Sequence, residues 1–346
     1  MMRISVSLVE PGAVLAKPVY DGRGSILLAR GVQLTSGYLQ RLKDLAIQSI
    51  YIESPFGDLI DYENALSEPV FVEVMKNTRH LVKMLASPRV DRDLSSAKKS
   101  VEMIVEELVR NRGTLLDLSA LHDYDEYTYS HCVSVCVLSI IIGMHAGLRR
   151  EELALLGMGA LLHDIGKTRI PAEITKKPGK LTAEEYAIMQ QHTRFGYDLL
   201  RKNSSLLSAH VAFQHQEKYD GTGYPRGVKG GDIHLFGRIA AVADVYDALT
   251  SRRPYRQPLP GHKAYEYIWS QSGAYFDPAM VRHFCGTVAI YPNGSLIELC
   301  NGKKGLVVKQ NAGWPLRPVV CVMEDNRVVE IIDLMDEAQT NLVIVA

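Results

Sequence analysis

The sequence predicts a mainly α-helical protein, in which a helical bundle core follows a small α+β module and precedes a small β-barrel. Three observations predict this class. Helical periodicity dominates residues 114–285. Short β runs separated by turn residues fill residues 286–346, whereas residues 1–66 mix strand and helix patterns. A chain of 346 residues also favours two or three units over a single domain.

Residues 1–66 predict a small α+β accessory module. Val14–Tyr20 and Ser25–Leu28 flank a glycine-containing turn and indicate a β-hairpin. Thr35–Leu45 has the apolar spacing of a helix, and Gln48–Ile52 has the composition of a strand. The module holds no cluster of reactive side chains, so the chemistry is expected elsewhere in the chain.

A charge-rich helical linker, residues 67–113, leads to the bundle, and Pro88 interrupts its helical pattern. The bundle itself spans residues 114–285. Thr182 and Glu185 form a capping box that opens one of its helices, because each side chain can bond the backbone amide of the other residue. Three further helices are predicted at Glu151–Leu162, Ser205–Gln216 and Arg238–Ser251.

Residues 286–346 predict a small β-barrel. The segment contains short β runs at Val288–Ile290, Leu296–Leu299, Gly305–Lys309, Val319–Met323, Val328–Ile332 and Leu342–Val345. Turn residues separate these runs, and short strands of this kind are typical of small closed sheets.

Composition excludes several classes of protein. Lysine plus arginine equals aspartate plus glutamate, at 39 each, which argues against a broad basic surface for duplex nucleic acid. The five cysteines are scattered without a CxxC pair, which favours a reducing cytoplasm over a disulfide framework or a zinc ribbon. The most apolar stretch, Cys132–Leu148, is too short and too interrupted for a membrane span and predicts a buried helix. No secretory signal is predicted, so we expect a cytoplasmic protein.

Histidine and aspartate recur where the flanking sequence is apolar and helical. A single helical histidine most often has a structural role. A carboxylate in a core helix, as at Asp244, costs several kcal/mol unless it is paired or bound to a metal. Several helices that direct such residues into one bundle core predict a di-metal site. Its candidate ligands are His131, His163, Asp164, His192, His215 and Asp244.

The donor set restricts the metal. Imidazole and carboxylate without thiolate suit iron or manganese, with zinc or nickel as alternatives, and exclude a soft Cu(I) site. Because Asp164 adjoins His163, its carboxylate can bridge two ions while the imidazole binds one. Two ions about 3.5–4 Å apart can hold a hydroxide and clamp a phosphodiester for in-line attack. These residues therefore predict a phosphodiesterase centre with two divalent ions.

A glycine-rich turn and three cations allow two interpretations. Asp220–Pro225 taken alone could be an ordinary turn, and Lys167 could be a cation at a helix C-terminus. Arg253 and Arg256 could belong to a solvated loop. Beside a phosphodiesterase centre, however, these cations and Tyr224 become candidates for holding phosphates and a guanine.

The motifs follow one another in a characteristic order: Leu161–Lys167, Ile170–Pro171, Lys177–Thr182, His192, His215–Pro225, Arg238–Thr250, Arg253–Arg256 and Phe276–Pro278. Together they resemble the HD-GYP family of the HD superfamily. The resemblance covers residues 115–285, about half of the chain, and the number of motifs makes it specific.

The resemblance implies an all-helical domain that hydrolyses cyclic di-GMP to pGpG, and can cut that product onward to GMP, with a hydroxide activated by two metal ions. It implies that the ligands of the first ion are His131, His163, Asp164 and Asp244. The implied ligands of the second ion are Asp164, His192 and His215. Lys167 would contact the scissile phosphate and protonate the leaving oxygen. The implied dinucleotide-binding residues are Tyr224, Arg253, Arg256 and Asp125. Asp247 would contact a metal ligand rather than a metal ion.

Two positions depart from the family pattern. The family usually has His-His-Glu where this chain has His215, Gln216 and Glu217, so one expected ligand of the second ion is a carboxamide. Tyr127 stands where members with a third metal carry glutamate, so we expect no third ion. Gln216 supports an alternative function, a degenerate domain that binds cyclic di-GMP or a partner protein and signals without turnover. Another cyclic dinucleotide is a further candidate substrate, because base selectivity depends on pocket shape.

Partners follow from the same resemblance. Cyclic di-GMP is the implied ligand, and the further candidates are a second copy of the chain in a homodimer, a diguanylate cyclase or another signalling protein. We expect residues 1–66 and 286–346 to set the geometry of a dimer or to regulate access to the site.

Overall fold

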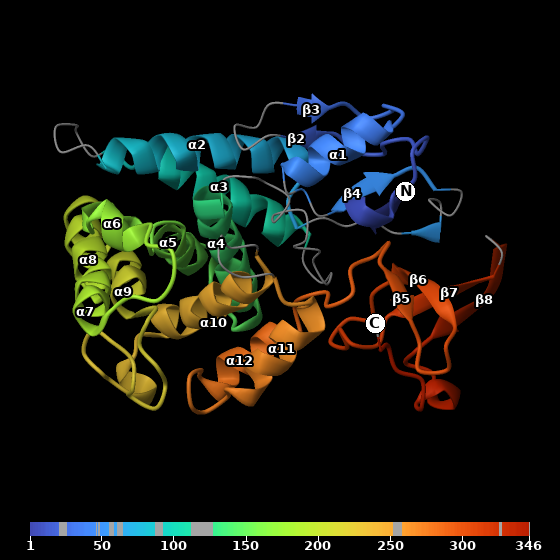
Figure 1. Ribbon diagram of the computed structural model, residues 1–346. Coiled ribbons are helices and arrows are strands. Elements are labelled where there is room, and N and C mark those ends of the chain that lie inside the picture. Colours follow the sequence, from blue (N-terminus) through green and yellow to red (C-terminus); the bar gives the residue numbers. More distant parts are fainter. Residues whose placement is uncertain are drawn as a thin grey trace. The chain divides into compact units, whose positions relative to one another are not determined.

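The computed structural model describes residues 1–20, 26–45, 47, 49–54, 59–60, 65–86, 93–111, 127–251, 258–324 and 327–345. Contacts between residues divide the chain into two compact units (Figure 1). The first unit combines the described residues of Met1–Ala65 and Gly286–Ala346, and the second combines those of Leu66–Arg112 and Tyr127–Cys285. The two ends of the chain thus share a unit, and the linker helices join the bundle. The boundaries of the four predicted segments stay a prediction.

The second unit is built from helices, as the sequence predicts. The α-helices are α2 (Glu68–Ala86), α3 (Ser95–Arg110), α4 (Tyr127–His145), α5 (Arg150–Leu161), α6 (Ala172–Thr175), α7 (Ala183–Gln190), α8 (His192–Asn203), α9 (Leu206–Gln214), α10 (Leu235–Thr250), α11 (Gly261–Ser270) and α12 (Pro278–Cys285). Two 3₁₀ turns, η4 (Ile165–Arg169) and η5 (Gly230–Asp232), lie between them. Helix α4 packs against α5 and α10, while α9 packs against α5, α8 and α10.

Two largely buried helices, α4 and α10, form the centre of the unit. Every residue of α4 from Ser130 to Gly143 is buried, so the apolar stretch noted in the sequence is a core helix, as predicted. Helix α10 is buried along most of its length, and its small alanines let neighbouring helices approach closely. No helix in the described part of the chain combines the length and apolar character needed to cross a membrane.

The N-terminal part of the first unit is a small α+β fold. Strands β1 (Met2–Ser5) and β4 (Ser49–Ile52) pair antiparallel, as do β2 (Val19–Tyr20) and β3 (Ile26–Leu28). The second pair confirms the strands of the predicted hairpin, whose turn lies outside the described residues. A 3₁₀ turn, η1, spans Val6–Leu8, and the predicted helix is α1 (Ser36–Asp44). Its start is capped by Thr35, whose side chain accepts the amide of Tyr38.

The C-terminal part of the first unit contains an antiparallel four-stranded sheet in chain order. Its strands are β5 (Leu296–Glu298), β6 (Lys304–Lys309), β7 (Val319–Glu324) and β8 (Arg327–Asp333), with a 3₁₀ turn, η6, at Glu337–Gln339. Within the described residues the strand pairings do not close this sheet into a barrel. Of the two other predicted β runs, Val288–Ile290 forms no strand, and Leu342–Val345 contributes a single bridge, from Ile344 to Leu299.

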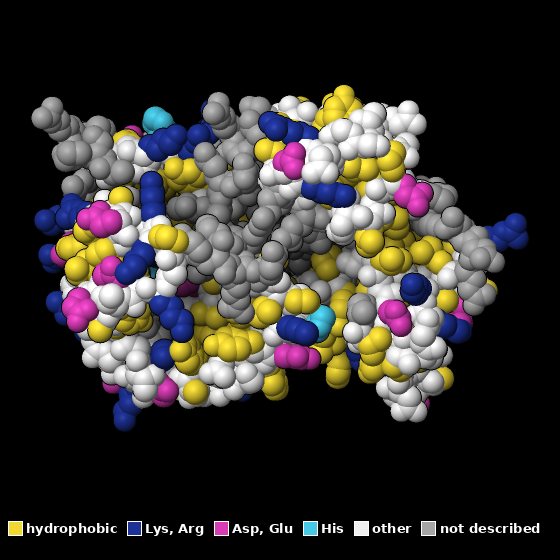
Figure 2. All heavy atoms as spheres, viewed as in Figure 1, with side chains coloured by type: hydrophobic (Ala, Val, Ile, Leu, Met, Phe, Trp, Pro, Cys, Tyr) yellow, Lys and Arg dark blue, Asp and Glu magenta, His cyan; other side chains and the backbone are white. Residues whose placement is uncertain are grey.

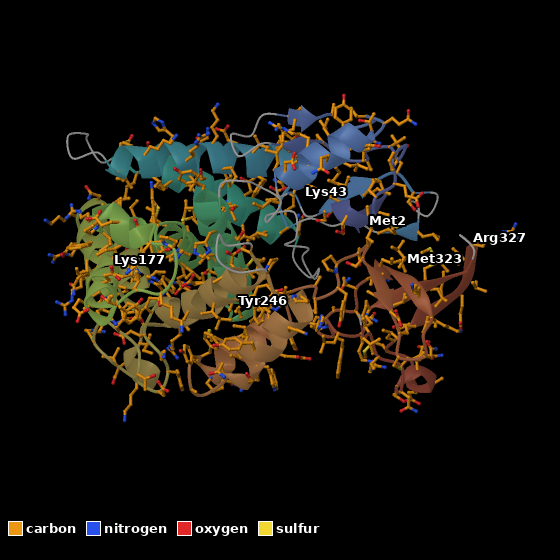
Figure 3. The ribbon with its side chains drawn as sticks, in the orientation of Figure 1. Met2, Lys43, Lys177, Tyr246, Met323 and Arg327 are labelled. Carbon is orange, nitrogen blue, oxygen red and sulfur yellow. The ribbon has the colours of Figure 1, made fainter. Side chains whose placement is uncertain are left out.

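One small hydrophobic cluster joins the two parts of the first unit. Ile60 is buried together with Leu306 and Cys321 of the C-terminal sheet. Met2 and Met323, both labelled in Figure 3, pack against this cluster. Burial of these side chains explains why two segments at opposite ends of the sequence form one unit.

Candidate metal centre

Six side chains predicted to bind metal converge at the core of the helical unit. His131 lies in the second turn of α4, and Asp244 lies midway along α10. The others stand at helix ends, namely His163 with Asp164 after α5, His192 at the start of α8 and His215 after α9. The four histidines and Asp244 are at most 8% exposed. The bundle therefore brings these residues together in its largely buried core.

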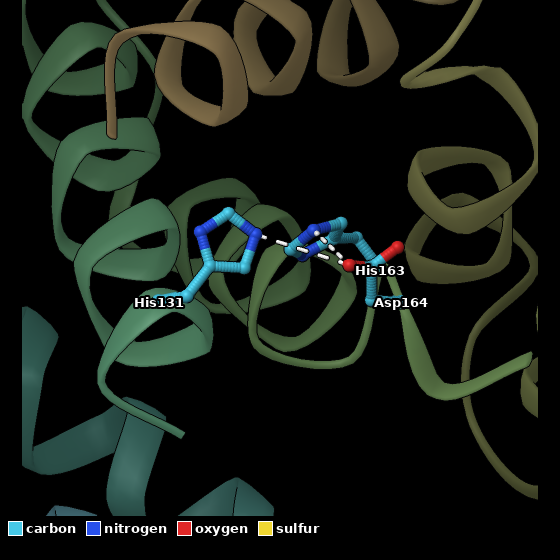
Figure 4. Close-up of side chains that lie close together, drawn as sticks. All are labelled: His131, His163 and Asp164. Atoms are coloured by element: carbon cyan, nitrogen blue, oxygen red, sulfur yellow. Dashed lines mark ion pairs between the residues drawn. The ribbon is translucent and has the colours of Figure 1, made fainter. Parts of the chain in front are cut away.

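The two carboxylate oxygens of Asp164 face two different pairs of imidazoles. Oδ2 lies 3.4 Å from His163 Nε2 and 3.9 Å from His131 Nε2, as Figure 4 shows. Oδ1 lies 3.5 Å from His192 Nε2 and 3.7 Å from His215 Nε2. A carboxylate with one oxygen toward each of two donor groups has the geometry of a ligand that bridges two ions.

Asp244 adds a second carboxylate to the first of these groups. Its Oδ1 lies 3.3 Å from His131 Nε2 and 3.9 Å from His163 Nε2. The donor atoms form three overlapping sets, each within 4.8 Å: His131, His163 and Asp164; His163, His215 and Asp244; Asp164, His192 and His215. The structure thus brings together every residue for which the sequence predicts a metal-ligand role.

Three of the imidazoles are held by the helix that precedes them. Nδ1 of His163, His192 and His215 each donates to the carbonyl oxygen three residues earlier, at 2.7, 2.7 and 3.1 Å. A carbonyl oxygen can only accept, so the proton of each neutral ring lies on Nδ1 and the lone pair of Nε2 points into the cluster. The same contacts tie each imidazole to the last turn of the helix before it.

Lone pairs that face one another require a cation. The Nε2 atoms of His192 and His215 are 3.3 Å apart, and neither carries a proton in this tautomer. In the described part of the chain, Nε2 of His163 and Oδ1 of Asp164 are buried without a hydrogen bond. Such groups cost free energy unless a cation binds them. The cluster therefore fits divalent metal ions, and its imidazole and carboxylate donors suit iron, manganese, zinc or nickel.

The histidines of the cluster differ in their affinity for protons. Burial alone lowers the pKa of His131, but hydrogen bonds to Asp244 and Asp247 outweigh burial and raise the pKa to about 9. Burial, together with the neighbouring imidazoles, lowers the pKa of His215 to about 3. A proton therefore competes with a metal ion at His131 and not at His215.

Both carboxylates stay ionised in the bundle core. Burial raises the pKa of Asp164, but the charge of Lys167 outweighs it and holds the pKa well below its usual range. Burial likewise raises the pKa of Asp244, and its hydrogen bond to His131 outweighs this and lowers the pKa. Ionised carboxylates are the form that binds metal ions.

The Gly-Tyr-Pro turn folds back on the residues that follow α9. The amide of Tyr224 donates to the carbonyl of Gln216 at 3.1 Å. A Cβ at Gly223 would overlap the backbone at 216–218, so only glycine fits there. The carboxylate of Glu217 accepts the amides of Arg226 and Gly227 at 2.9 and 3.0 Å. Tyr224 is thereby fixed near the metal centre, with its ring centroid 6.2 Å from that of His192.

The comparisons with known proteins agree with this geometry. The family model described as HD domain matches residues 116–280. A cyclic di-GMP phosphodiesterase of Pseudomonas aeruginosa, PA4108, is 33% identical over 339 residues, which covers 88% of this chain and 82% of that protein. A likeness of this extent decides the family. The chain belongs to the HD-GYP family.

Two further proteins are similar to this chain. A cyclic di-GMP phosphodiesterase of Thermotoga maritima is 44% identical over 171 residues, 48% of this chain and 46% of that protein. The solved structure of Bd1817, an HDG"Y"P protein of Bdellovibrio bacteriovorus, shares the fold with a TM-score of 0.52 at 19% identity, and covers 82% of this chain and 97% of its own. The Pseudomonas protein matches far more than the HD domain, so the likeness includes segments outside the bundle.

Asp247 occupies the supporting position predicted from the HD-GYP resemblance. It is fully buried, and its Oδ2 accepts a hydrogen bond of 2.6 Å from Nδ1 of His131. This bond fixes the orientation of the imidazole and directs Nε2 toward Asp164 and Asp244. Carboxylate–histidine pairs of this kind increase the basicity of a metal-binding histidine.

Gln216, the departure from the HD-GYP pattern, contacts a candidate ligand. Its Nε2 donates to Oδ2 of Asp244 at 3.0 Å. This bond leaves Oδ1 of Asp244 as the oxygen that faces His131 and His163. A carboxamide that donates in this way orients Asp244, whereas an imidazole at the same position would offer a further metal ligand.

The remaining predicted residues divide into two groups. Lys167 lies at the edge of the cluster, with Nζ 2.5 Å from Oδ2 of Asp164 and 45% of its side chain exposed. Its predicted role at the scissile phosphate stays a prediction. Asp125, Arg253 and Arg256 lie outside the described residues, as does the side chain of Tyr127.

Sequence reasoning missed the contacts that hold the turn in place. In the sequence, Glu217 stands out only as part of the motif that starts at His215. Nothing in the sequence around a glutamate shows that it is buried or which groups it bonds. Arg238 and Asp277 form an ion pair of 2.6 Å between α10 and the start of α12. The backbone amides of Tyr219 and Asp220 donate to carbonyls of Tyr275 and Ala274, at 3.0 and 2.9 Å, just before Asp277. Helix α10 therefore supports the turn as well as carrying Asp244.

Metal uptake by the metal-free protein should release about one proton at pH 7. The pKa of His131, about 9, lies above its ordinary value of 6.5, so protonation of His131 stabilises the metal-free fold below pH 6.5. That contribution is lost as the pH rises through 9. Manganese titrations by calorimetry, in buffers of different ionisation enthalpy, measure the release. His145→Gln, an exposed position on α4, should leave it unchanged, and uptake without proton release contradicts the electrostatics above.

Glu217→Gln should destabilise the fold by about 1.5–3 kcal/mol, because the new amide group faces two backbone amides where a carboxylate accepted both. Urea unfolding measures the change. Glu106→Gln is the matched control, since its exposed pair with Arg110 should contribute less than about 1 kcal/mol. Equal stability of the two variants would show that Glu217 does not hold the turn.

Proposed function

We propose that the chain is a metal-dependent phosphodiesterase that hydrolyses cyclic di-GMP to pGpG and cuts this product onward to GMP. One observation carries the proposal: the two oxygens of Asp164 face two separate pairs of buried imidazoles. Phosphodiester hydrolysis is the chemistry for which two adjacent ions are best suited. Relatives from Pseudomonas and Thermotoga, named as cyclic di-GMP phosphodiesterases, support this substrate.

Each group of residues has a role in this proposal. Two bound divalent ions, iron or manganese first, would supply Lewis acidity and a hydroxide nucleophile. The four histidines and the two carboxylates, Asp164 and Asp244, would hold the ions and exclude bulk water from the bundle core. Asp247 would orient His131 through the bond of 2.6 Å.

Lys167 and Tyr224 would act on the substrate. The ammonium of Lys167 lies beside the bridging carboxylate and is partly exposed, so it can reach a phosphate oxygen and donate a proton to the leaving oxygen. Tyr224 would position the dinucleotide from the Gly-Tyr-Pro turn. Arg253, Arg256 and Asp125 keep the substrate-binding roles that the resemblance implies.

The charge distribution favours a small phosphodiester over duplex nucleic acid. The chain has no net charge at pH 7, and on the face seen in Figure 2 basic and acidic side chains are interspersed over the helical unit. Duplex binding needs a continuous basic surface, whereas a small dinucleotide needs only a few cations at one site. A homodimer, a diguanylate cyclase or another signalling protein as partner, and the cytoplasm as location, stay predictions.

Gln216 supports a second candidate function. Because its carboxamide donates to Asp244, the group around His192 and His215 lacks a ligand that the HD-GYP pattern supplies. A chain that retains one ion poorly could bind cyclic di-GMP and signal without turnover. The presence of Asp164, Lys167 and an intact Gly-Tyr-Pro turn in this chain favours the enzyme.

Cyclic di-GMP turnover by the purified protein, reconstituted without oxygen with Fe(II) or Mn(II), tests the proposal. The natural protein should form pGpG, and Asp164→Asn should lose turnover by about 10³-fold or more, because the bridging charge is gone. Asp198→Asn, at an exposed pair with Arg201 on α8, is the matched control and should retain full activity. Metal content is measured for every sample.

The Gln216→His variant separates the two candidate functions. If the natural protein is inactive with both metals while Gln216→His gains activity, the chain is a sensor and the enzymatic proposal is wrong. Parallel assays with other cyclic dinucleotides define the substrate, since faster hydrolysis of one of them would reassign it.

A further inference from the structure

An exposed aromatic side chain, Tyr186 of α7, contacts the Gly-Tyr-Pro turn. Its ring centroid lies 6.1 Å from that of Tyr224, with the planes at 81°, which is an edge-to-face contact. Tyr224 in turn makes an edge-to-face contact with His192 at 6.2 Å. The three rings therefore form a series of contacts from the surface to the metal centre.

Exposure decreases steadily along this series of rings. Tyr186 is 48% exposed, Tyr224 is partly buried and His192 is 1% exposed. A single exposed tyrosine is ordinary on a protein surface. A tyrosine whose ring contacts Tyr224, beside the candidate metal cluster, is within reach of a nucleotide whose phosphate would occupy that cluster.

Helix α7 presents Tyr186 on a fixed support without using it in the core. None of the residues of α7 is buried, so hydrophobic packing does not explain the helix. Thr182 and Glu185 form the predicted capping box at its start. Lys177, labelled in Figure 3, holds Glu185 with bonds of 2.5 and 2.7 Å, and the amide of Tyr186 donates to the carbonyl of Thr182. These contacts fix the first turn, where Tyr186 stands.

We propose that Tyr186 is a substrate-binding residue whose ring stacks against a purine base of the cyclic dinucleotide. The inference rests on the proposed function and extends it to the base, because the metal centre and Lys167 contact only the phosphates. Stacking on an aromatic ring suits any purine, so Tyr186 contributes affinity, while selection among purines lies with polar contacts elsewhere. The edge-to-face contact with Tyr224 orients the two rings beside the metal cluster.

Three substitutions test the proposal through KM, kcat and direct binding. Tyr186→Leu should raise KM for cyclic di-GMP by about tenfold or more, with little change in kcat, because the metal centre is intact. Tyr186→Phe keeps the ring and should stay within about threefold of the natural KM. Tyr267→Leu, the same change at an exposed tyrosine of α11, is the control and should leave KM unchanged. Metal content and thermal unfolding should be equal in all four proteins.

The outcomes separate this inference from the proposed function. If the natural protein turns over cyclic di-GMP and Tyr186→Leu keeps its KM, the stacking role is wrong and the phosphodiesterase stands. A Phe variant as impaired as the Leu variant would assign the effect to the hydroxyl group of Tyr186 and overturn stacking. If the natural protein binds cyclic di-GMP without turnover, weaker calorimetric binding by Tyr186→Leu still supports stacking. A natural protein that neither binds nor hydrolyses it overturns both proposals.

Discussion

The buried negative charge of Asp164 is the constraint on which the helical unit depends. A carboxylate in a bundle core is costly unless cations and hydrogen-bond donors surround it. The chain meets this requirement by ending three helices at histidines. His163, His192 and His215 each bond the last turn of the preceding helix through Nδ1, and each turns Nε2 toward the carboxylates. The contact that joins each histidine to a helix end is therefore also the one that directs its Nε2 toward the carboxylates, so the helix ends position the site.

A second set of contacts connects this centre to the surface that would receive substrate. Helix α10 positions Asp244 in the candidate metal cluster, and its Arg238 pairs with Asp277 at the start of α12. The backbone before Asp277 supports the segment that leads into the Gly-Tyr-Pro turn, while Glu217 clamps the turn from the other side. The candidate metal ligands and Tyr224 are thus positioned by one framework. A disturbance of the turn can alter substrate binding while the metal ligands keep their places.

The residues of the candidate metal centre are easier to predict from the sequence than the residues that surround them. An aspartate such as Asp244 in an apolar helix carries its own signal, because its burial needs a partner. Glu217, Arg238 and Tyr186 carry no such signal, since charged and aromatic residues are common in loops and on surfaces. The helices of the bundle follow from local periodicity and capping. The packing of the two chain ends into one unit does not follow from local patterns. Ile60 and Cys321 share a hydrophobic cluster although they lie far apart in the sequence. A closed barrel is not evident in the described strands, because a pattern of β runs does not specify which edges pair.

The donor atoms divide unequally between the two metal positions. One position has His131, His163, one oxygen of Asp164 and Oδ1 of Asp244, whereas the other has His192, His215 and the remaining oxygen of Asp164. Gln216 increases the inequality because it engages Asp244 as a donor and binds no ion itself in this geometry. Fewer charged donors mean weaker binding and easier exchange with water. Under the proposed function, Gln216 would therefore weaken the binding of one ion selectively, and the choice between enzyme and sensor would depend on how tightly the position at His192 and His215 is filled.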